Sequence, residues 1–295
     1  MFDSTILNDL KLKEPLKTRR ECGKNDQCDH WAIPIAYYDH FVVEDLEYIL
    51  FPPYNFNNFE NILIKNNFKI VKNFGLIVAY KKLKSVEVAT PKPQSISIAT
   101  LFYDDSVTHL PLFFKHHQTI GVDKFFMYYN GPLSLVIDSL PKLAGVEYIE
   151  WNYPYYVVNE SGQVLATTQA ACLNTYMRKY GVFSDYNIFI DVDEYVLCKN
   201  LKTRLKGEQN HLFLDHRFAV IENNCVTYES TLSKETAGKM IINTKLFTPE
   251  TIIQIHNFWP PFPPCDIIMA HNRGTWHIQD KLCSNISLDT LYKNE

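Results

Sequence analysis

Three carboxylates stand within four positions at the end of an apolar run. The stretch NIFIDVDEY (187–195) places Asp191, Asp193 and Glu194 directly after residues typical of a buried strand. Like charges this close repel one another, and burying them without a partner costs several kcal/mol. We therefore expect a positive group beside them. Asp191 and Asp193 share one face of extended chain and offer hard oxygen donors, which suit Mg²⁺ or Mn²⁺ and, through the metal, phosphate oxygens. The alternative is a solvated strand end whose acids cap the next helix.

The elements around this stretch alternate between strand and helix. Short links between alternating elements predict an α/β fold whose mostly parallel sheet is covered by helices on both faces. Ligands of such sheets bind beyond the carboxyl ends of the strands, which is where the acidic stretch falls. We expect strands over 96–102, 124–129, 146–151 and 187–191, and helices over 108–120, 133–140 and 167–180.

The segment PKPQS (91–95) predicts a linker, because two prolines disfavour helix and supply no ladder donors. It divides the chain into a small α+β accessory region over residues 1–94 and a main domain over residues 95–295. Within the accessory region, VEDLEYIL (43–50) predicts a short helix stopped by two prolines, and residues 58–82 predict a helix followed by two strands joined by a tight turn.

The composition narrows the class of protein. A net charge of −4 and a pI near 6.2 argue against binding to nucleic acid or to anionic membranes. Seven scattered cysteines favour reduced thiols over a disulfide framework. No apolar run approaches the roughly 20 residues of a membrane span, and the first residues lack the apolar core of a signal peptide. We expect a cytoplasmic protein without a membrane span, and the oligomeric state stays open.

Five motifs in order resemble the nucleotide-sugar-dependent glycosyltransferases of the GT-A fold, and more narrowly family 92 and the related family 2-like enzymes. The resemblance covers roughly residues 96–277. Two departures are Asn272, where the family has tyrosine, and NGP (130–132), where it has aspartate and serine after the second strand. The motifs are HHQTIGVDKFFMYYNG (116–131), Gln169 to Asn174, Asp191 to Tyr195, His256 after an apolar run, and His271-Asn272-Arg273.

The resemblance implies a GT-A fold, a Rossmann-like mixed sheet that is mostly parallel. It implies metal-dependent transfer of a sugar, as in hexosyltransferases, from a nucleotide-diphosphate donor to a hydroxyl of a glycan or glycoconjugate, with inversion. It also implies that Asp193 binds the metal and that Asp191 contacts the metal or the donor ribose. His271, returning from a loop, is our candidate third metal ligand, and Arg273 our candidate partner of the diphosphate. An ordinary hydrogen-bonded histidine and a surface salt bridge are the alternatives.

Several side chains are candidates for the donor, because a GT-A enzyme holds the nucleobase and ribose where the first strand ends. Gln169 opens a helix facing the expected crevice. Turn formation and helix capping are the alternative roles. The candidates for nucleotide-sugar binding are Thr100, Tyr103, Asp104, Asn130, Gln169, Asp191 and Arg273.

Inverting transfer needs a general base for the acceptor hydroxyl. We favour Glu222, which follows the apolar run FAVI, while Asp215, Glu229 and Asp266 also qualify by position. The catalytic candidates are therefore Glu222, Asp191 and Asp193. For the acceptor we single out His256 and Trp259, since the stiff aromatic loop FWPPFPP (258–264) fits the apolar side of a sugar ring.

Two other functions share these features. A haloacid-dehalogenase-type phosphohydrolase also places Asp-x-Asp at a strand end, although there the motif follows the first strand of the core rather than the fourth. A catalytically inactive glycan-binding protein could keep the same fold. The retention of both aspartates, His271 and Arg273 argues against loss of activity.

Overall fold

The structure of the protein is a computed structural model. It describes residues 37–53, 56–73, 75–83, 95–153, 155, 157–158, 164–165, 167–208, 211–222, 225–229, 239–254, 264–272 and 283–287.

The main sheet is mixed, with ten strands among the described residues and the order β11-β15-β12-β14-β10-β5-β6-β7, to which β13 is added beside β12, and β16 beside β13. Strands β10, β5, β6 and β7 run parallel, as expected, whereas β14 is antiparallel to both β10 and β12, and β11 is antiparallel to β15. The strands are β5 (Ile96–Phe102), β6 (Lys124–Tyr129), β7 (Val146–Glu150), β10 (Tyr186–Phe189), β11 (Glu194–Leu197), β12 (Leu212–Glu222), β13 (Cys225–Glu229), β14 (Met240–Asn243), β15 (Pro264–Asn272) and β16 (Cys283–Ser287).

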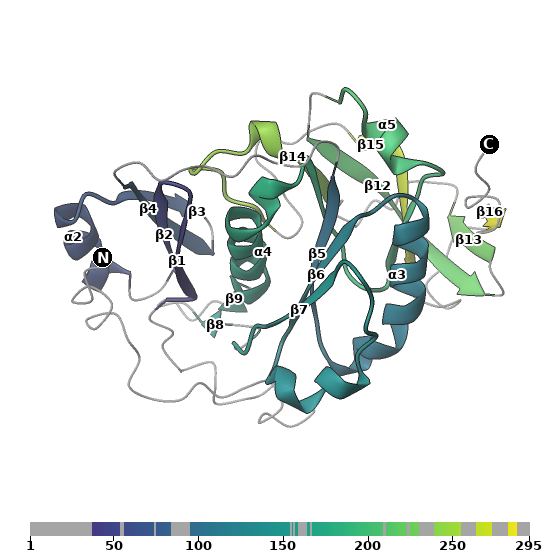
Figure 1. Ribbon diagram of the computed structural model, residues 1–295, viewed down its shortest axis with the longest axis horizontal. Helices are drawn as coiled ribbons and strands as arrows, with labels where there is room; N and C mark the ends of the chain where they lie inside the picture. Colours follow the sequence, from purple (N-terminus) through teal and green to yellow (C-terminus); the bar gives the residue numbers. More distant parts are fainter. Residues whose placement is uncertain are drawn as a thin grey trace.

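Helices cover both faces of the parallel half, and the alternation of side chains along each strand explains why. On β6, Phe125 and Met127 belong to the core cluster beneath α3, while Phe126 and Tyr128 belong to the cluster beneath α4. Figure 1 shows α3 and α4 on opposite sides of β5 and β6. The helices of this part are α3 (Leu110–Thr119), α4 (Thr167–Lys179) and α5 (Leu201–Leu205), and its 3₁₀ turns are Asp104–His109, Leu133–Leu135, Ile137–Ser139, Gly181–Phe183 and Thr244–Leu246.

A second sheet, with the order β1-β2-β4-β3, precedes the main one. Its inner face shares a core with α4, and its outer face packs on α2. In Figure 1 α4 lies between the two sheets. The elements are β1 (Asp39–Val43), β2 (Leu46–Phe51), α2 (Asn57–Lys65), β3 (Lys69–Asn73) and β4 (Leu76–Lys82), and a separate two-stranded ribbon consists of β8 (Val157–Val158) and β9 (Val164–Leu165).

Polar contacts also join the second sheet to α4. The ammonium of Lys179 lies 2.8 Å from the carboxylate of Asp39. The buried guanidinium of Arg178 stands 5.5 Å from the ring centre of Tyr48 and donates to the Thr251 carbonyl at 2.6 Å.

The linker at 91–94 lies outside the described residues, so the division of the chain at residue 94 stays a prediction.

Two expected helices are wrong. Residues 43–50 form the hairpin of β1 and β2, in which Val43 pairs with Leu46 and Glu44 takes a positive φ of 54°. Because both faces of β2 are covered, its apolar run does not reveal the strand by alternation. Residues 133–140 form two 3₁₀ turns, 133–135 and 137–139, rather than one helix. The expected helix–strand–turn–strand pattern over 58–82 is confirmed by α2, β3 and β4.

No helix among the described residues is both long and apolar enough to cross a membrane. Cys172, which is buried in α4, is a free thiol, in keeping with the expectation from the cysteine spacing.

Two glycines with the same φ of +80° test the packing before β7. We expect Gly145→Ala to lower the free energy of unfolding more than Gly207→Ala, although both substitutions incur the cost of about 1–2 kcal/mol for a left-handed residue. A Cβ at Gly145 would meet the Asp123 carbonyl oxygen at 2.6 Å, whereas at Gly207 no atom of the described residues lies within 4 Å. The clash should add about 1–3 kcal/mol in urea unfolding. Equal losses for the two variants would contradict this packing.

Candidate functional site

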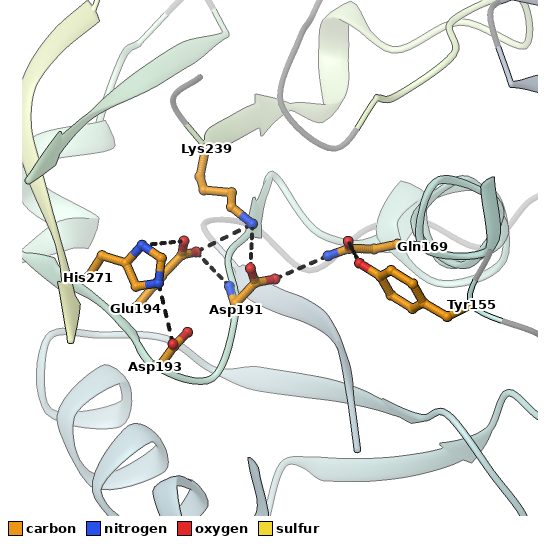
Figure 2. Close-up of polar contacts among 7 residues, drawn as sticks. All are labelled: Tyr155, Gln169, Asp191, Asp193, Glu194, Lys239 and His271. Carbon is orange, nitrogen blue, oxygen red and sulfur yellow. Dashed lines mark hydrogen bonds and ion pairs between the residues drawn. The ribbon is translucent and has the colours of Figure 1, made fainter. Parts of the chain in front are cut away.

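The acidic stretch forms the turn between β10 and β11. Val192 is buried and the carboxylates on either side of it stay partly exposed, as the alternation of the sequence predicts. Both oxygens of Asp191 have partners: Oδ1 accepts from Gln169 Nε2 at 3.1 Å, and Oδ2 lies 2.8 Å from Lys239 Nζ. Gln169 Oε1 in turn accepts from the Tyr155 hydroxyl at 3.0 Å. Figure 2 shows this chain of contacts running from Tyr155 to Lys239.

Lys239 is the positive group that the electrostatic argument requires, and the sequence reasoning missed it. It immediately precedes β14, whose Met240 pairs with Phe189 of β10, so the antiparallel register carries the lysine to the end of β10. The side chain is only 5% exposed, and its ammonium lies 3.6 Å from Glu194. Burial would lower the pKa of Lys239, but Asp191 and Glu194 raise it above its ordinary value. The feature of the sequence that could have indicated this contact is a lysine directly before the apolar run MIIN (240–243), which forms the strand.

Glu194 fixes the shape of the acidic turn. Its Oε2 accepts from the Asp191 backbone N–H at 2.6 Å, and its side chain is buried beside Lys239. Glu194 thus holds both the local backbone and a neighbouring cation, Lys239. Burial raises the pKa of Glu194 to about 7, against the attraction of Lys239.

Asp193 and His271 form a second pair on the other side of the turn. His271 Nε2 lies 3.3 Å from Asp193 Oδ2, and its Nδ1 lies 3.7 Å from Glu194 Oε1. The expectation that His271 returns from a loop is wrong: it lies on β15, opposite Glu194 of β11. Pairing of these two antiparallel strands is what brings the imidazole to the acidic turn (Figure 2).

This arrangement fits a Mg²⁺ or Mn²⁺ ion in one respect. Such ions commonly take one or two protein ligands and complete their shell with water and phosphate oxygens. The Asp193 carboxylate and the His271 imidazole are two adjacent donors of suitable chemistry. Both oxygens of Asp191, by contrast, already face Lys239 and Gln169. Within the described ranges, no group of three or more histidine, cysteine or acidic side chains is arranged to hold a metal ion.

Thr100 lies beside the acidic turn. It shares a narrow crevice with Gln169, Asp191 and Lys239 where β5 and β10 end. The Thr100 hydroxyl is buried, and among the described residues it has no hydrogen-bond partner. A buried hydroxyl without a partner carries a desolvation cost that a ligand would remove. Of the side chains expected to contact a donor, Thr100, Gln169 and Asp191 are thus brought together.

Other candidates have structural partners or lie elsewhere. The Asn130 amide donates to the carbonyls of Trp151 and Tyr153, which fastens the end of β6 to the chain after β7. Asp104 accepts a hydrogen bond from the Tyr129 hydroxyl, and Tyr103 next to it is exposed.

Most of the side chains that we expect to act as the general base or to bind the acceptor lie outside the part of the chain that the structure describes. Glu222 ends β12 and pairs with Cys225 through the backbone. Asp215 is buried in a bidentate contact with Arg217, at 3.0 and 2.5 Å, which occupies its carboxylate. The roles of the remaining candidates stay predictions, because their residues or side chains lie outside the described set: Glu222, Glu229, His256, Trp259, Asp266 and Arg273.

The fold is that of an α/β protein with a partly parallel sheet, and a polar crevice lies where its strands end. The chain belongs to glycosyltransferase family 92, whose model matches residues 92–273, more than half of its length. The resemblance read from the motifs is thereby confirmed, and membership supports glycosyltransferase activity in general.

No curated protein sequence matches the chain. Among solved structures, the chain is similar to HddC from Yersinia pseudotuberculosis, with 12% identity, a TM-score of 0.36, and coverage of 65% of this chain and 93% of that one.

Lys239 gives this site a test of stability. We expect Lys239→Met to lower the free energy of unfolding by about 3–5 kcal/mol, because it leaves the buried Glu194 carboxylate without its cation. Lys202→Met, which removes an exposed pair with Asp123, should cost no more than about 1 kcal/mol. Urea unfolding measures both, and adding Glu194→Gln to Lys239→Met should recover part of the loss. A loss at Lys239 no larger than that at Lys202 would contradict the charge balance described above.

Proposed function

We propose that the chain is a metal-dependent glycosyltransferase of the GT-A type, which moves a sugar from a nucleotide-diphosphate donor to a hydroxyl of a glycan or glycoconjugate. The observation that carries the proposal is the meeting of Asp193 and His271 at 3.3 Å beyond the parallel strands, inside the region matched by family 92. A bound Mn²⁺ or Mg²⁺ would neutralise the charge of the leaving diphosphate.

The two aspartates then have different roles. Asp193 and His271 would hold the metal, since Asp191 is engaged by Lys239 and Gln169. Asp191 would face the donor ribose or sugar, with its carboxylate held in place by these two partners. Lys239 acts here as a positioning residue, because its contacts run to Asp191 and Glu194. Thr100, in the same crevice, would offer its hydroxyl to the donor.

For the transfer itself we propose inversion. A base takes the proton of the acceptor hydroxyl, the acceptor oxygen bonds to the anomeric carbon, and the bond from that carbon to the diphosphate oxygen breaks. Glu222 remains our candidate for the base, with Arg273 for the diphosphate and His256 and Trp259 for the acceptor. Asp215 is a poorer candidate because Arg217 occupies its carboxylate.

Metal-dependent nucleotide binding tests this function. With Mn²⁺ present, we expect one of UDP, GDP or CDP to raise the melting temperature, since a ligand that binds only the native state stabilises it. Asp193→Asn should abolish that shift, whereas Asp138→Asn, which removes an exposed carboxylate of a 3₁₀ turn, should keep it.

Two outcomes would contradict the proposal. One is a nucleotide-induced shift that Asp193→Asn leaves unchanged. The other is release of phosphate from p-nitrophenyl phosphate, without release of nucleoside diphosphate from any sugar nucleotide, which would favour the phosphohydrolase. Nucleotide binding without turnover in the presence of acceptors would instead favour an inactive glycan-binding protein.

Thr100 gives a finer test of the donor site. Thr100→Val keeps the shape of the side chain but removes a buried hydroxyl that lacks a partner among the described residues. We expect nucleotide-sugar affinity to fall about fivefold, the worth of one hydrogen bond, without loss of stability. The control is Ser97→Ala on the same strand, whose hydroxyl contacts Ser184 at 2.6 Å; it should lower stability and keep the affinity. Unchanged affinity in Thr100→Val would remove Thr100 from the donor site.

A further inference from the structure

A second cavity of about 200 Å³ lies between the start of β1, the far end of α4, and strands β6 and β7. It is formed jointly by the N-terminal sheet and the main domain, whose elements meet around α4 (Figure 1). The residues used below are Tyr38, Asp39, Tyr128, Trp151, Tyr153, Thr175 and Lys179, all of which line it.

Aromatic rings form one wall of this cavity. The rings of Tyr38 and Trp151 are stacked with their centres 6.3 Å apart, and Tyr153 packs edge-on against both, at 5.3 Å and 4.9 Å. Tyr128 meets Trp151 edge-on at 5.7 Å. Tyr38, Tyr128 and Trp151 are buried and hold Tyr153, which is partly exposed and can offer a rigid ring to the apolar side of a sugar.

Two hydroxyl groups in the cavity lack partners among the residues that the structure describes. They are the Tyr128 hydroxyl and Thr175 Oγ1, and both side chains belong to residues that are 1% exposed. A buried hydroxyl without a hydrogen bond is costly, and buried polar groups in folded proteins nearly always have a partner. Two such groups from different elements, β6 and α4, therefore point to a polar ligand between them.

The charges around the cavity argue for a neutral ligand. Lys179 pairs with Asp39 at 2.8 Å, so its positive charge is already balanced, and Glu150, the third charged residue of the lining, accepts a hydrogen bond from the Leu133 backbone N–H at 2.8 Å. The volume is below the roughly 300 Å³ at which sites for drug-sized ligands begin, which leaves room for a single ring rather than a nucleotide. Thr175 also lies six residues beyond Gln169, about 9 Å further along α4 from the acidic turn.

We propose that this cavity is a second, non-catalytic binding site for one neutral sugar ring. The ring stacks on the aromatic wall, and its hydroxyls bond to Tyr128 and Thr175. The proposal does not depend on the transfer reaction, because none of its residues belongs to the acidic turn.

The test is binding of named neutral monosaccharides to the full chain without metal or nucleotide. Saturation-transfer NMR with glucose, galactose, mannose, fucose and N-acetylglucosamine should show contact with at least one of them. Tyr128→Phe and Thr175→Val should each weaken that sugar about fivefold. Tyr148→Phe, which removes a hydroxyl bonded to the Pro141 carbonyl at 2.8 Å, serves as the matched control and should bind normally.

The possible outcomes decide between distinct conclusions. Retained sugar binding in Asp193→Asn supports a site separate from the acidic turn, whatever becomes of the transfer activity. Binding that Tyr128→Phe and Thr175→Val leave unchanged would overturn the proposal, as would a crystal structure in the sugar with only ordered water at both hydroxyls. Displacement of the sugar by UDP would place the cavity in the donor site and would also overturn it.

Discussion

The balance of charge where β10 ends is the constraint on which the site depends. Asp191, Asp193 and Glu194 meet there within one turn, and Glu194 is buried. Lys239, also buried, lies 2.8 Å from Asp191 and 3.6 Å from Glu194. Because an unpaired buried charge is strongly destabilising, the turn depends on a strand from later in the chain. Pairing of β14 with β10 is therefore a requirement of the site as well as of the sheet.

Two strand pairings, β14 with β10 and β15 with β11, separate the roles of the carboxylates. Lys239 and Gln169 occupy Asp191, while β15 brings His271 to Asp193. Glu194 accepts a hydrogen bond from the Asp191 backbone N–H and so fixes the conformation of the turn. Each of the three acids thus faces a different set of partners, and the metal site that we propose uses the Asp193–His271 pair.

The N-terminal sheet contributes to the architecture through α4. One end of this helix carries Gln169 to the acidic turn, and its other end carries Arg178 and Lys179 to Tyr48 and Asp39 of the second sheet. A single helix therefore joins the crevice to the accessory region. The second cavity lies along this helix, and both parts of the chain are needed to form it.

The sequence by itself determined the alternating half of the fold and the place of the acidic turn. Strands β5, β6, β7 and β10 and helices α3 and α4 carry strong apolar patterns, and five ordered motifs identified the family. Local pattern failed at 43–50, where burial on both faces hides the strand, and at 133–140, where two 3₁₀ turns replace a helix.

Only the tertiary structure decided which cation meets the acids. Lys239 is far from Asp191 in sequence, and the antiparallel register of β14 on β10 brings the two together. Likewise, His271 reaches Glu194 and Asp193 through the pairing of β15 with β11, not through a loop. Long-range pairing leaves no mark in local spacing, so a charge argument from sequence could require a partner without identifying it.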